Sequence, residues 1–233
     1  MTAASSAKVL AAAINTDSSS TGVKATAQTA VKISLSADPG TTTAMTLSGG
    51  GTAVAISASV TDADDLTELL AVMNTYSGTT GVTAEFDGSD KSALILRESD
   101  GDDITIEGFA ASDTAATPAA LDLTVQKQSN FEGTEFTTGV TLTSAGNDST
   151  IATGVVRLGS TKSFTLSAGG AGSVSYIDGG SGTTAASSLT KVSNVSVSSQ
   201  AGAESALSVL DGAIQMVNTS RASLGAFSNR LDS

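Results

Sequence analysis

A long apolar repeat near the C-terminal end constrains the fold more than any other feature of the sequence. Between Ser198 and Ser233, apolar residues recur every seven positions, and a second apolar row lies beside the first at helical spacing. Such a repeat places one stripe on a long helix that is stabilised by packing against a partner helix. No other segment carries matching heptads, so the partner is predicted to be missing or to come from another molecule. The two rows are Ala203, Leu210, Val217, Leu224 and Leu231, and Ala206/Leu207, Ala213/Ile214 and Phe227.

Composition excludes several classes of chemistry. The 233 residues include neither Cys nor His, which removes disulfides, thiolate nucleophiles, imidazole bases and soft-metal sites. A net charge of −12 repels nucleic-acid backbones and anionic membrane surfaces. No apolar run approaches the length needed to span a bilayer. The sequence therefore predicts no cofactor, no nucleic-acid partner and no membrane partner.

An internal repeat lies in the N-terminal part of the chain. Residues 10–25 read LAAAINTDSSSTGVKA, and residues 69–84 read LLAVMNTYSGTTGVTA, at an offset of 59. Each copy combines an apolar helical stretch, Asn-Thr, a Ser/Thr/Gly loop and then Thr-Gly-Val-x-Ala. We expect each copy to form a helix, a loop and a strand. The repeat-motif residues are Asn15, Gly22 and Val23 in the first copy, and Asn74, Gly81 and Val82 in the second.

The residue types in these copies predict local details. Thr61 or Asp62 is expected to cap the second helix. Asn15 and Asn74 are expected to end their helices in the left-handed conformation. The glycines Gly22 and Gly81 would give a tight entry into each strand. The expected buried faces are Leu10, Ala13 and Ile14 in the first helix, and Leu66, Leu69, Leu70 and Met73 in the second.

Alternating apolar and polar residues predict short strands through most of the remaining chain. The expected strands are 22–27, 30–36, 43–48, 53–60, 81–86, 93–97, 103–107, 121–127, 138–143, 153–158, 163–167 and 173–177, with one more at 192–197. Residues 178–188 are rich in Gly, Ser and Thr and are expected to form a linker or loop.

The predicted fold class is α+β. Short helices would pack on antiparallel sheets in a β-rich body, followed by one long C-terminal amphipathic helix. The predicted division is an outer repeat region at 1–110, a β-rich remainder of the outer domain at 111–197, and a helical core segment at 198–233.

The C-terminal run resembles the flagellin family. The signature is Arg221-x-x-Leu224-Gly225-Ala226-x-x-Asn229-Arg230-Leu231, and flagellins typically show Arg-Ala-x-Leu-Gly-Ala-x-x-Asn-Arg at this place. The repeated Asn-Thr…Thr-Gly-Val-x-Ala units resemble the "IN" motif in the outer domains of flagellins and hook-associated proteins. The resemblance identifies the chain as a fragment with the variable outer domains and the start of the C-terminal core helix.

That resemblance implies a structural subunit of the bacterial flagellar filament, serving motility and surface display and not catalysis. It implies export without a cleaved signal peptide, an extracellular location and other flagellin subunits as partners. O-linked glycans are a further class of partner in this family. A flagellin-sensing Toll-like receptor is another, with binding weakened because the family's N-terminal core helix is missing.

The assembly-facing residues expected on the core helix are Leu210, Val217, Arg221, Leu224, Gly225, Asn229, Arg230 and Leu231. Arg221 and Arg230 either bridge to carboxylates of a neighbouring helix or line a solvated face. Gly225 either marks a close helix approach or is a tolerated surface glycine.

Two rival functions stay open at this point. The first is a hook-associated or adhesin-like binding module built from the same repeats. The second is a carboxylate-dependent enzyme acting on glycans, for which Asp122 and Glu107 are available acids, although no spacing selects them.

Overall fold

The structure is a computed structural model that describes residues 6–36, 41–111, 122–144, 146–167, 184–195, 197 and 200–231. The chain forms two compact units. Unit 1 comprises residues 1–13 and 25–157, and unit 2 comprises residues 14–24 and 158–233. These two units do not follow the predicted division of the sequence into 1–110, 111–197 and 198–233. That division describes regions of the sequence and stays a prediction.

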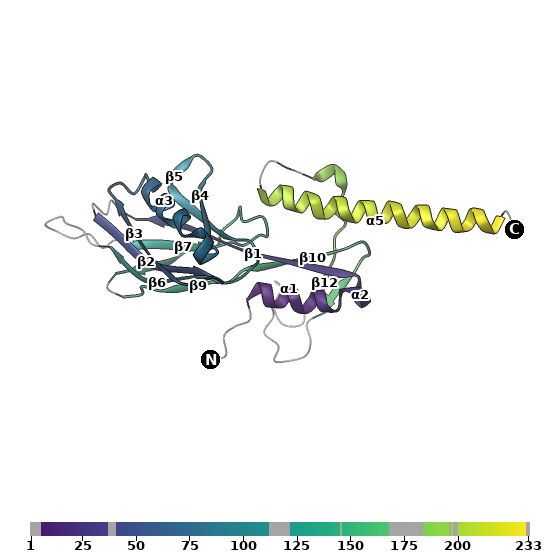
Figure 1. The fold of residues 1–233 in the computed structure, drawn as a ribbon, viewed down its shortest axis with the longest axis horizontal. Coiled ribbons are helices and arrows are strands. Elements are labelled where there is room, and N and C mark those ends of the chain that lie inside the picture. The colour runs from purple at the N-terminus through teal and green to yellow at the C-terminus, as the bar shows by residue number, and fades with distance from the viewer. Residues whose placement is uncertain are drawn as a thin grey trace. The chain divides into compact units, whose positions relative to one another are not determined.

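The helices and strands are numbered in chain order, and Figure 1 labels them where there is room. The helices are α1 (Ala7–Thr16), α2 (Ser18–Thr21), α3 (Thr67–Thr75), α4 (Ser77–Thr80), the 3₁₀ helix η1 (Val192–Asn194) and α5 (Gln200–Leu231). The strands are β1 (Val23–Leu35), β2 (Thr41–Gly49), β3 (Val54–Val60), β4 (Thr83–Asp87), β5 (Asp90–Glu98), β6 (Ile104–Ala111), β7 (Asp122–Lys127), β8 (Val140–Thr143), β9 (Thr150–Ala152), β10 (Val155–Ser160), β11 (Thr165–Ser167) and β12 (Thr184–Ala186).

Unit 1 is built on two antiparallel sheets. One sheet has the strand order β4-β5-β1-β7-β8, with β10 also paired to β1, and the other has the order β3-β2-β6-β9. Alternation along the strands turns the apolar side chains to one face, so that Ile33 lies opposite Leu94 on β5 and Val125 on β7. In the other sheet Leu47 lies opposite Val54 on β3 and Ile106 on β6.

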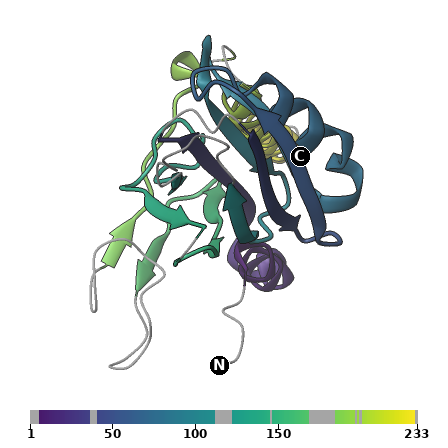
Figure 2. The ribbon, with the colours of Figure 1, turned by 90° about the vertical axis from the view of Figure 1, so that its left-hand side faces the viewer.

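A single hydrophobic core joins the inner faces of the two sheets with helix α3. Its fully buried side chains include Leu96 and Ile33 from the larger sheet and Phe109 from the smaller one. Helix α3 packs on β3 and β4, and thus lies along the side of both sheets (Figure 2). The expected α+β class is confirmed, with short helices on antiparallel sheets and one long C-terminal helix.

The predicted helix and strand occur in both copies of the repeat, but the segment predicted as a loop is helical. In each copy the Ser/Thr/Gly segment winds into one short helix, α2 or α4, that a glycine ends. Gly22 and Gly81 have φ angles of 69° and 79°, in the left-handed region that glycine adopts at little cost. The Gly22 N–H donates to Ser18 over 2.8 Å, and the Gly81 N–H donates to Ser77 over 2.9 Å.

Several local expectations about the repeat are wrong. No asparagine among the described residues has a positive φ angle, so Asn15 and Asn74 do not end their helices in the left-handed conformation. Helix α3 begins at Thr67, later than expected, and the carboxylate that accepts from the Thr67 N–H is that of Asp65 and not Asp62. The buried residues of α1 are Ala7 and Ala11, whereas Leu10 and Ile14 are partly buried and Ala13 is exposed. Of the residues expected to be buried at the second helix, Leu66, Leu69 and Met73 are buried. Leu70 is partly buried.

Strand expectations were mostly right within the described residues. Two predicted strands, 22–27 and 30–36, form the single long strand β1. The short strands β9 and β12 were not expected, and residues 192–194 form the 3₁₀ helix η1 where a strand was predicted. The predicted strand 173–177 lies outside the described residues. The alternating Val and Ser residues at 192–197 are compatible with a strand or a 3₁₀ helix over so few residues. Their β propensity does not decide between the two.

Unit 2 differs from unit 1 in the amount of buried apolar surface. Helix α5 runs through 32 residues and contacts η1. Strands β11 and β12 form a separate two-stranded antiparallel sheet. Among the described residues of unit 2, Ala206 is the one buried apolar side chain. The described part of unit 2 therefore has little core of its own.

Candidate assembly surface on the C-terminal helix

Helix α5 carries the strongest candidate functional surface. At 1.5 Å per residue, its 32 residues extend over about 48 Å. Arg230 lies in the last turn of α5, where a positive charge suits the helix dipole. Thr219 and Ser220 donate their hydroxyls to carbonyls four residues earlier, at 2.9 Å each. These bonds keep both hydroxyls satisfied within the helix.

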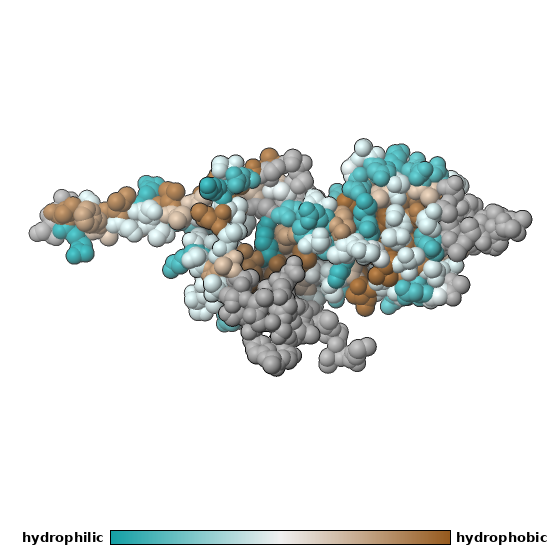
Figure 3. Space-filling model, turned by 180° about the vertical axis from the view of Figure 1, so that it is seen from behind, coloured by the Kyte–Doolittle hydropathy of each residue, from teal (hydrophilic) through white to brown (hydrophobic). Residues whose placement is uncertain are grey.

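The predicted apolar stripe is present and exposed to solvent. Its large side chains are between 42% and 70% exposed, although such residues normally lie inside a protein. In Figure 3, brown apolar residues recur along the C-terminal part of α5. A contiguous apolar surface of this kind marks an interaction site. The exposed stripe residues, which we call the α5 stripe, are Leu207, Leu210, Ile214, Val217, Leu224, Phe227 and Leu231.

A shallow hollow adjoins the N-terminal half of the α5 stripe. Val192 of η1 forms one side of the hollow. Five residues from neighbouring turns of α5 form the other side. The lining is almost entirely apolar, because Asn218 alone brings a polar side chain. The hollow can thus accept an apolar side chain. Its α5 residues are Leu210, Ala213, Ile214, Val217 and Asn218.

The polar members of the signature border the α5 stripe. Arg221, Gly225 and Asn229 are spaced by four residues, so they form one row along an edge of the stripe. All three are exposed, as is Arg230. Nothing in the described chain lies within 4 Å of a Cβ atom built on Gly225. The close approach expected at Gly225, and the ion pairs expected for the two arginines, stay predictions about a partner.

The repeat-motif residues lie away from the α5 stripe and have structural contacts. Asn74 ties α3 to β4, because its side-chain amide donates to the Ala84 carbonyl at 2.9 Å and its Oδ1 accepts from the Ala84 N–H at 2.8 Å. Val82 is buried in the core of unit 1, whereas its counterpart Val23 is only partly buried. Asn15 is exposed at the end of α1. The second copy thus contributes to the core more than the first copy does.

A glycine loop explains part of the difference between the two copies. The N–H groups of Gly51 and Thr52 donate to the carbonyls of Thr80 and Thr79 at 3.3 and 2.9 Å. A Cβ atom on Gly51 would lie 2.2 Å from the Thr79 oxygen, so only glycine fits there. The loop therefore covers the turn of the second copy. At the first copy, the Ser160 hydroxyl donates to the Gly22 carbonyl at 2.7 Å.

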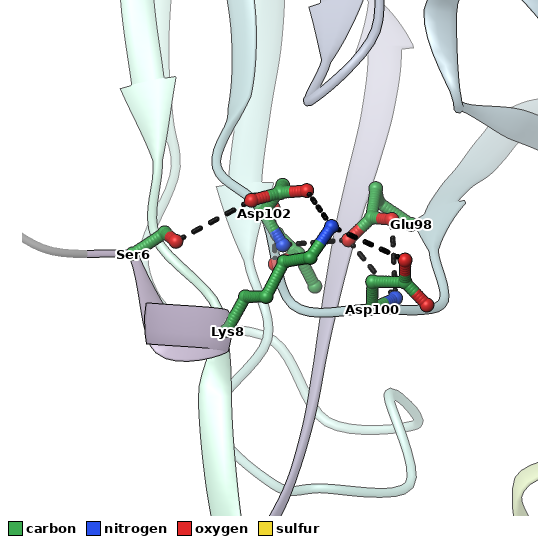
Figure 4. A network of polar contacts seen from close by, with 6 residues as sticks. Ser6, Lys8, Glu98, Asp100 and Asp102 are labelled. Carbon is green, nitrogen blue, oxygen red and sulfur yellow. Dashed lines mark hydrogen bonds and ion pairs between the residues drawn. The ribbon is translucent and has the colours of Figure 1, made fainter. Parts of the chain in front are cut away.

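A polar network holds the start of α1 against the β5–β6 turn within unit 1 (Figure 4). The Lys8 ammonium group lies 2.7 Å from Asp102 and 3.2 Å from Asp100. The hydrogen bonds that the Lys8 ammonium group donates to these two carboxylates, to Asp102 first, raise the pKa of Lys8. The Lys8 N–H also donates to the Gly101 carbonyl at 2.9 Å. Because Lys8 and Asp100 are substantially exposed, this network positions α1 and adds little stability.

Glu98 organises the turn that carries those carboxylates. It is 5% exposed, and its carboxylate accepts from the N–H groups of Asp100, at 3.1 Å, and Asp102, at 2.6 Å. Burial raises the pKa of Glu98, although the backbone donors act in the opposite direction. The side chain is used to shape the turn, so its altered pKa does not by itself indicate catalysis.

The two acids available to an enzyme lie on different sheets. Glu107 is exposed on β6 of the four-stranded sheet, and Asp122 lies on β7 of the other sheet. Among the residues described, no group of three or more acidic side chains could hold a metal ion. No helix in the described ranges is long and apolar enough to cross a membrane.

Comparison with known proteins confirms the resemblance to flagellins. No protein-family profile matches the chain. The chain is 29% identical to B-type flagellin of Pseudomonas aeruginosa over 174 residues, which cover 74% of this chain and 33% of that protein. It is 56% identical to flagellin B of Vibrio cholerae serotype O1 over 39 residues, or 17% of this chain and 10% of that protein. The chain is therefore flagellin-like in sequence, and it spans about a third of the first relative and a tenth of the second.

Among solved structures, the D1-D2-D3 domains of the flagellar cap protein FliD from Escherichia coli give a TM-score of 0.28 at 13% identity. The overlap covers 59% of this chain and 49% of that chain. A superposition at this score assigns no common fold.

Sequence reasoning missed three features of the described chain. The burial of Ala206 and the position of Val192 beside α5 are tertiary features that no local pattern encodes. The contact between Lys8 and Asp102 joins residues far apart in sequence. Asp100-Gly101 signals a turn in the sequence, and Gly101 has a φ angle of 85°, but that signal does not identify Lys8 as the partner.

Proposed function

We propose that this chain is a structural part of a bacterial flagellar filament, in which α5 joins the helical core and unit 1 belongs to the outer surface. The observation that carries the proposal is the exposed α5 stripe, on which the flagellin signature from Arg221 to Leu231 is superimposed. Similarity to two flagellins supports the same assignment. Motility and surface display, outside the cell, would then be the roles of the assembled filament.

The energetics of α5 favour assembly over an isolated helix. A helix gains most of its stability from packing its apolar face, and each large side chain removed from water contributes about 1.5–3 kcal/mol when fully buried. The α5 stripe leaves most of that gain unused, because seven large side chains stay exposed. A second amphipathic helix would bury them. The arginines beside the stripe would then meet carboxylates of that helix.

The resemblance adds finer proposals about partners. Other flagellin subunits would contact the α5 stripe, and O-linked glycans would attach to hydroxyl-bearing loops of the outer region. The Toll-like receptor that senses flagellins would bind this chain weakly. The repeat-motif residues, from Asn15 to Val23 and from Asn74 to Val82, would serve as structural elements of the outer region.

Hydrogen exchange tests the assembly proposal. The whole chain is mixed with a synthetic peptide that carries the N-terminal core helix of a flagellin, and amide exchange is measured by mass spectrometry. We expect residues 200–231 to become protected at least tenfold, while exchange in unit 1 stays unchanged. The variant Leu224→Asp should abolish the protection, whereas Ala222→Asp, on the opposite face of α5, should retain it. Equal protection of both variants, or none in the natural chain, refutes the proposed role of α5.

A further inference from the structure

Strand β1 changes in burial and in pairing partway along its length. Its residues 23–27 alternate between exposed and at least partly buried, whereas residues 28–31 are buried in succession. Strands β5 and β7 pair with β1 from Thr29 onward. The boundary between the two units falls shortly before this change, ahead of Ala25. One strand therefore joins a weakly covered segment to the centre of the larger sheet.

The turn between β5 and β6 contacts β1 at the place where it changes. The Thr29 hydroxyl donates to the Asp102 carbonyl at 2.7 Å. A Cβ atom on Gly101 would lie 3.1 Å from the Gln28 nitrogen, and the φ angle of Gly101 is 85°. The glycine thus lets the turn approach the backbone of β1 closely.

Two further connections contact the same two residues of β1. In the β7–β8 connection, the Phe131 carbonyl accepts from the Gln28 side-chain amide, and the Gln128 amide donates to the Gln28 carbonyl at 2.9 Å. In the β9–β10 connection, a Cβ atom on Gly154 would lie 2.3 Å from the Thr29 hydroxyl oxygen and 2.7 Å from the Gln28 carbonyl oxygen. Three separate connections of unit 1 therefore hold β1 at residues 28 and 29.

Buried polar side chains are concentrated at this place. The described residues include six buried polar or charged side chains, and four of them, Gln28, Thr29, Glu98 and Gln128, lie here. Glu98 is opposite Thr29 on β5. A buried group that loses its hydrogen-bond partner is costly, so bonds that share partners tend to open together. We call these four residues and their two bonded partners the β1 collar: Gln28, Thr29, Glu98, Asp102, Gln128 and Phe131.

We propose that the β1 collar is a barrier to local opening. The segment at 23–27 opens by itself, whereas residues 28–35 leave the sheet only when unit 1 unfolds as a whole. Strand β10 is paired to the earlier part of β1, because β5 and β7 occupy both sides of residues 31–34, and most of β10 is only partly buried. The barrier lets the chain before Ala25 change conformation without loosening the core of unit 1. It is independent of the proposed role of α5.

Native-state hydrogen exchange, followed by NMR on the whole chain, tests the barrier. The slow amides of residues 29–35 should exchange only through unfolding of unit 1, so their rates should rise with urea as steeply as the rate of Leu96. The slowest amide within residues 23–27 should exchange about tenfold faster than Leu96 or more, with little dependence on urea. One common rate and one urea dependence along all of β1 would overturn the inference.

A matched pair of glycine substitutions tests the collar itself. Gly154→Ala forces a Cβ atom against Thr29, whereas a Cβ atom on Gly159 of β10 meets nothing within 4 Å among the described residues. Neither glycine has a positive φ angle, so backbone strain does not separate the two variants. Gly154→Ala should speed exchange of residues 28–30 about tenfold relative to Leu96, and Gly159→Ala should leave that ratio unchanged. Equal acceleration of residues 28–30 and Leu96 in Gly154→Ala would show a uniform loss of stability and refute the barrier.

The Thr29 hydroxyl supplies a second test that does not depend on the folding of Gly154→Ala. Thr29→Val removes the donor to Asp102 at similar volume, and Thr29→Ser keeps it. The valine variant should speed exchange of residues 28–30 about tenfold relative to Leu96, and the serine variant should keep the natural ratio. The same ratio in both variants would contradict the collar.

Discussion

In unit 1 most of the described large apolar side chains lie inside, whereas in unit 2 most of them lie at the surface. Leu96 of unit 1 is fully buried, and Leu224 of unit 2 is 67% exposed, although both are leucines in regular secondary structure. The two sheets of unit 1 and α3 bury one another. Helix α5 has a stripe of similar apolar character, and although α5 contacts η1, the large side chains of that stripe stay exposed. We infer from this difference that unit 1 is stabilised by its own core, whereas α5 needs a partner to bury its apolar stripe.

The largest expected effect comes from a matched pair of leucine substitutions. Leu96→Ala should lower the free energy of unfolding of unit 1 by about 2–5 kcal/mol, because it leaves a cavity in a close-packed core. Leu224→Ala should change that free energy by less than about 0.5 kcal/mol, since its side chain is exposed. Urea unfolding followed by tyrosine fluorescence and circular dichroism measures both. Similar losses in the two variants would remove the distinction between the units.

The turn glycines Gly22 and Gly81 occupy equivalent positions, so substituting each one compares the two copies of the repeat directly. Gly81→Ala should destabilise unit 1 by about 2 kcal/mol or more, because left-handed strain adds about 1–2 kcal/mol and the new Cβ atom meets the Gly49 oxygen at 2.5 Å. Gly22→Ala should show the strain alone, since its nearest neighbour lies at 3.9 Å. The measurement is thermal unfolding of both variants. An equal cost would mean that the glycine loop does not constrain the second copy.

Removing the Asn74 side chain tests how firmly the second copy is held. Asn74→Ala should cost about 1–3 kcal/mol, because the partly buried amide would no longer satisfy the N–H and carbonyl of Ala84. Asn74→Asp keeps the acceptor and loses the donor, so it should fall between the natural chain and Asn74→Ala. Hydrogen exchange of the Ala84 amide provides the local readout. An unchanged rate for Ala84 in Asn74→Ala would show that the asparagine does not hold β4.

The smallest expected effect is a pH dependence confined to unit 1. Burial raises the pKa of Glu98 above the ordinary value of 4.5, so protonation favours the folded state. Its contribution is fully present below the ordinary pKa and is lost as pH rises through the raised pKa. The stability of the natural chain relative to Glu98→Gln should therefore fall between acidic and neutral pH. A difference that rises with pH would show that the backbone donors outweigh burial.

The repeat and the strands show how far sequence alone reaches. Glycine at positions 22 and 81 predicted a turn correctly, because few other residues adopt a positive φ angle at low cost. Alternation located most strands, since one face of each sheet is buried. Asn74 was misjudged because its role depends on Ala84, which the fold brings within hydrogen-bonding distance. The helix start at Thr67 was missed because several aspartates in a row offered equivalent caps.

For the α5 stripe too, some features follow from the sequence and others only from the tertiary structure. The heptad spacing in the sequence determined that α5 would be a long helix with an apolar stripe, because spacing along a helix fixes which side chains share a face. Only the tertiary structure decided that the stripe stays exposed from Leu207 to Leu231, that Ala206 is buried, and that Val192 forms a hollow beside it. Burial depends on which segments fold back onto a surface, and that is set by contacts distant in sequence rather than by local pattern.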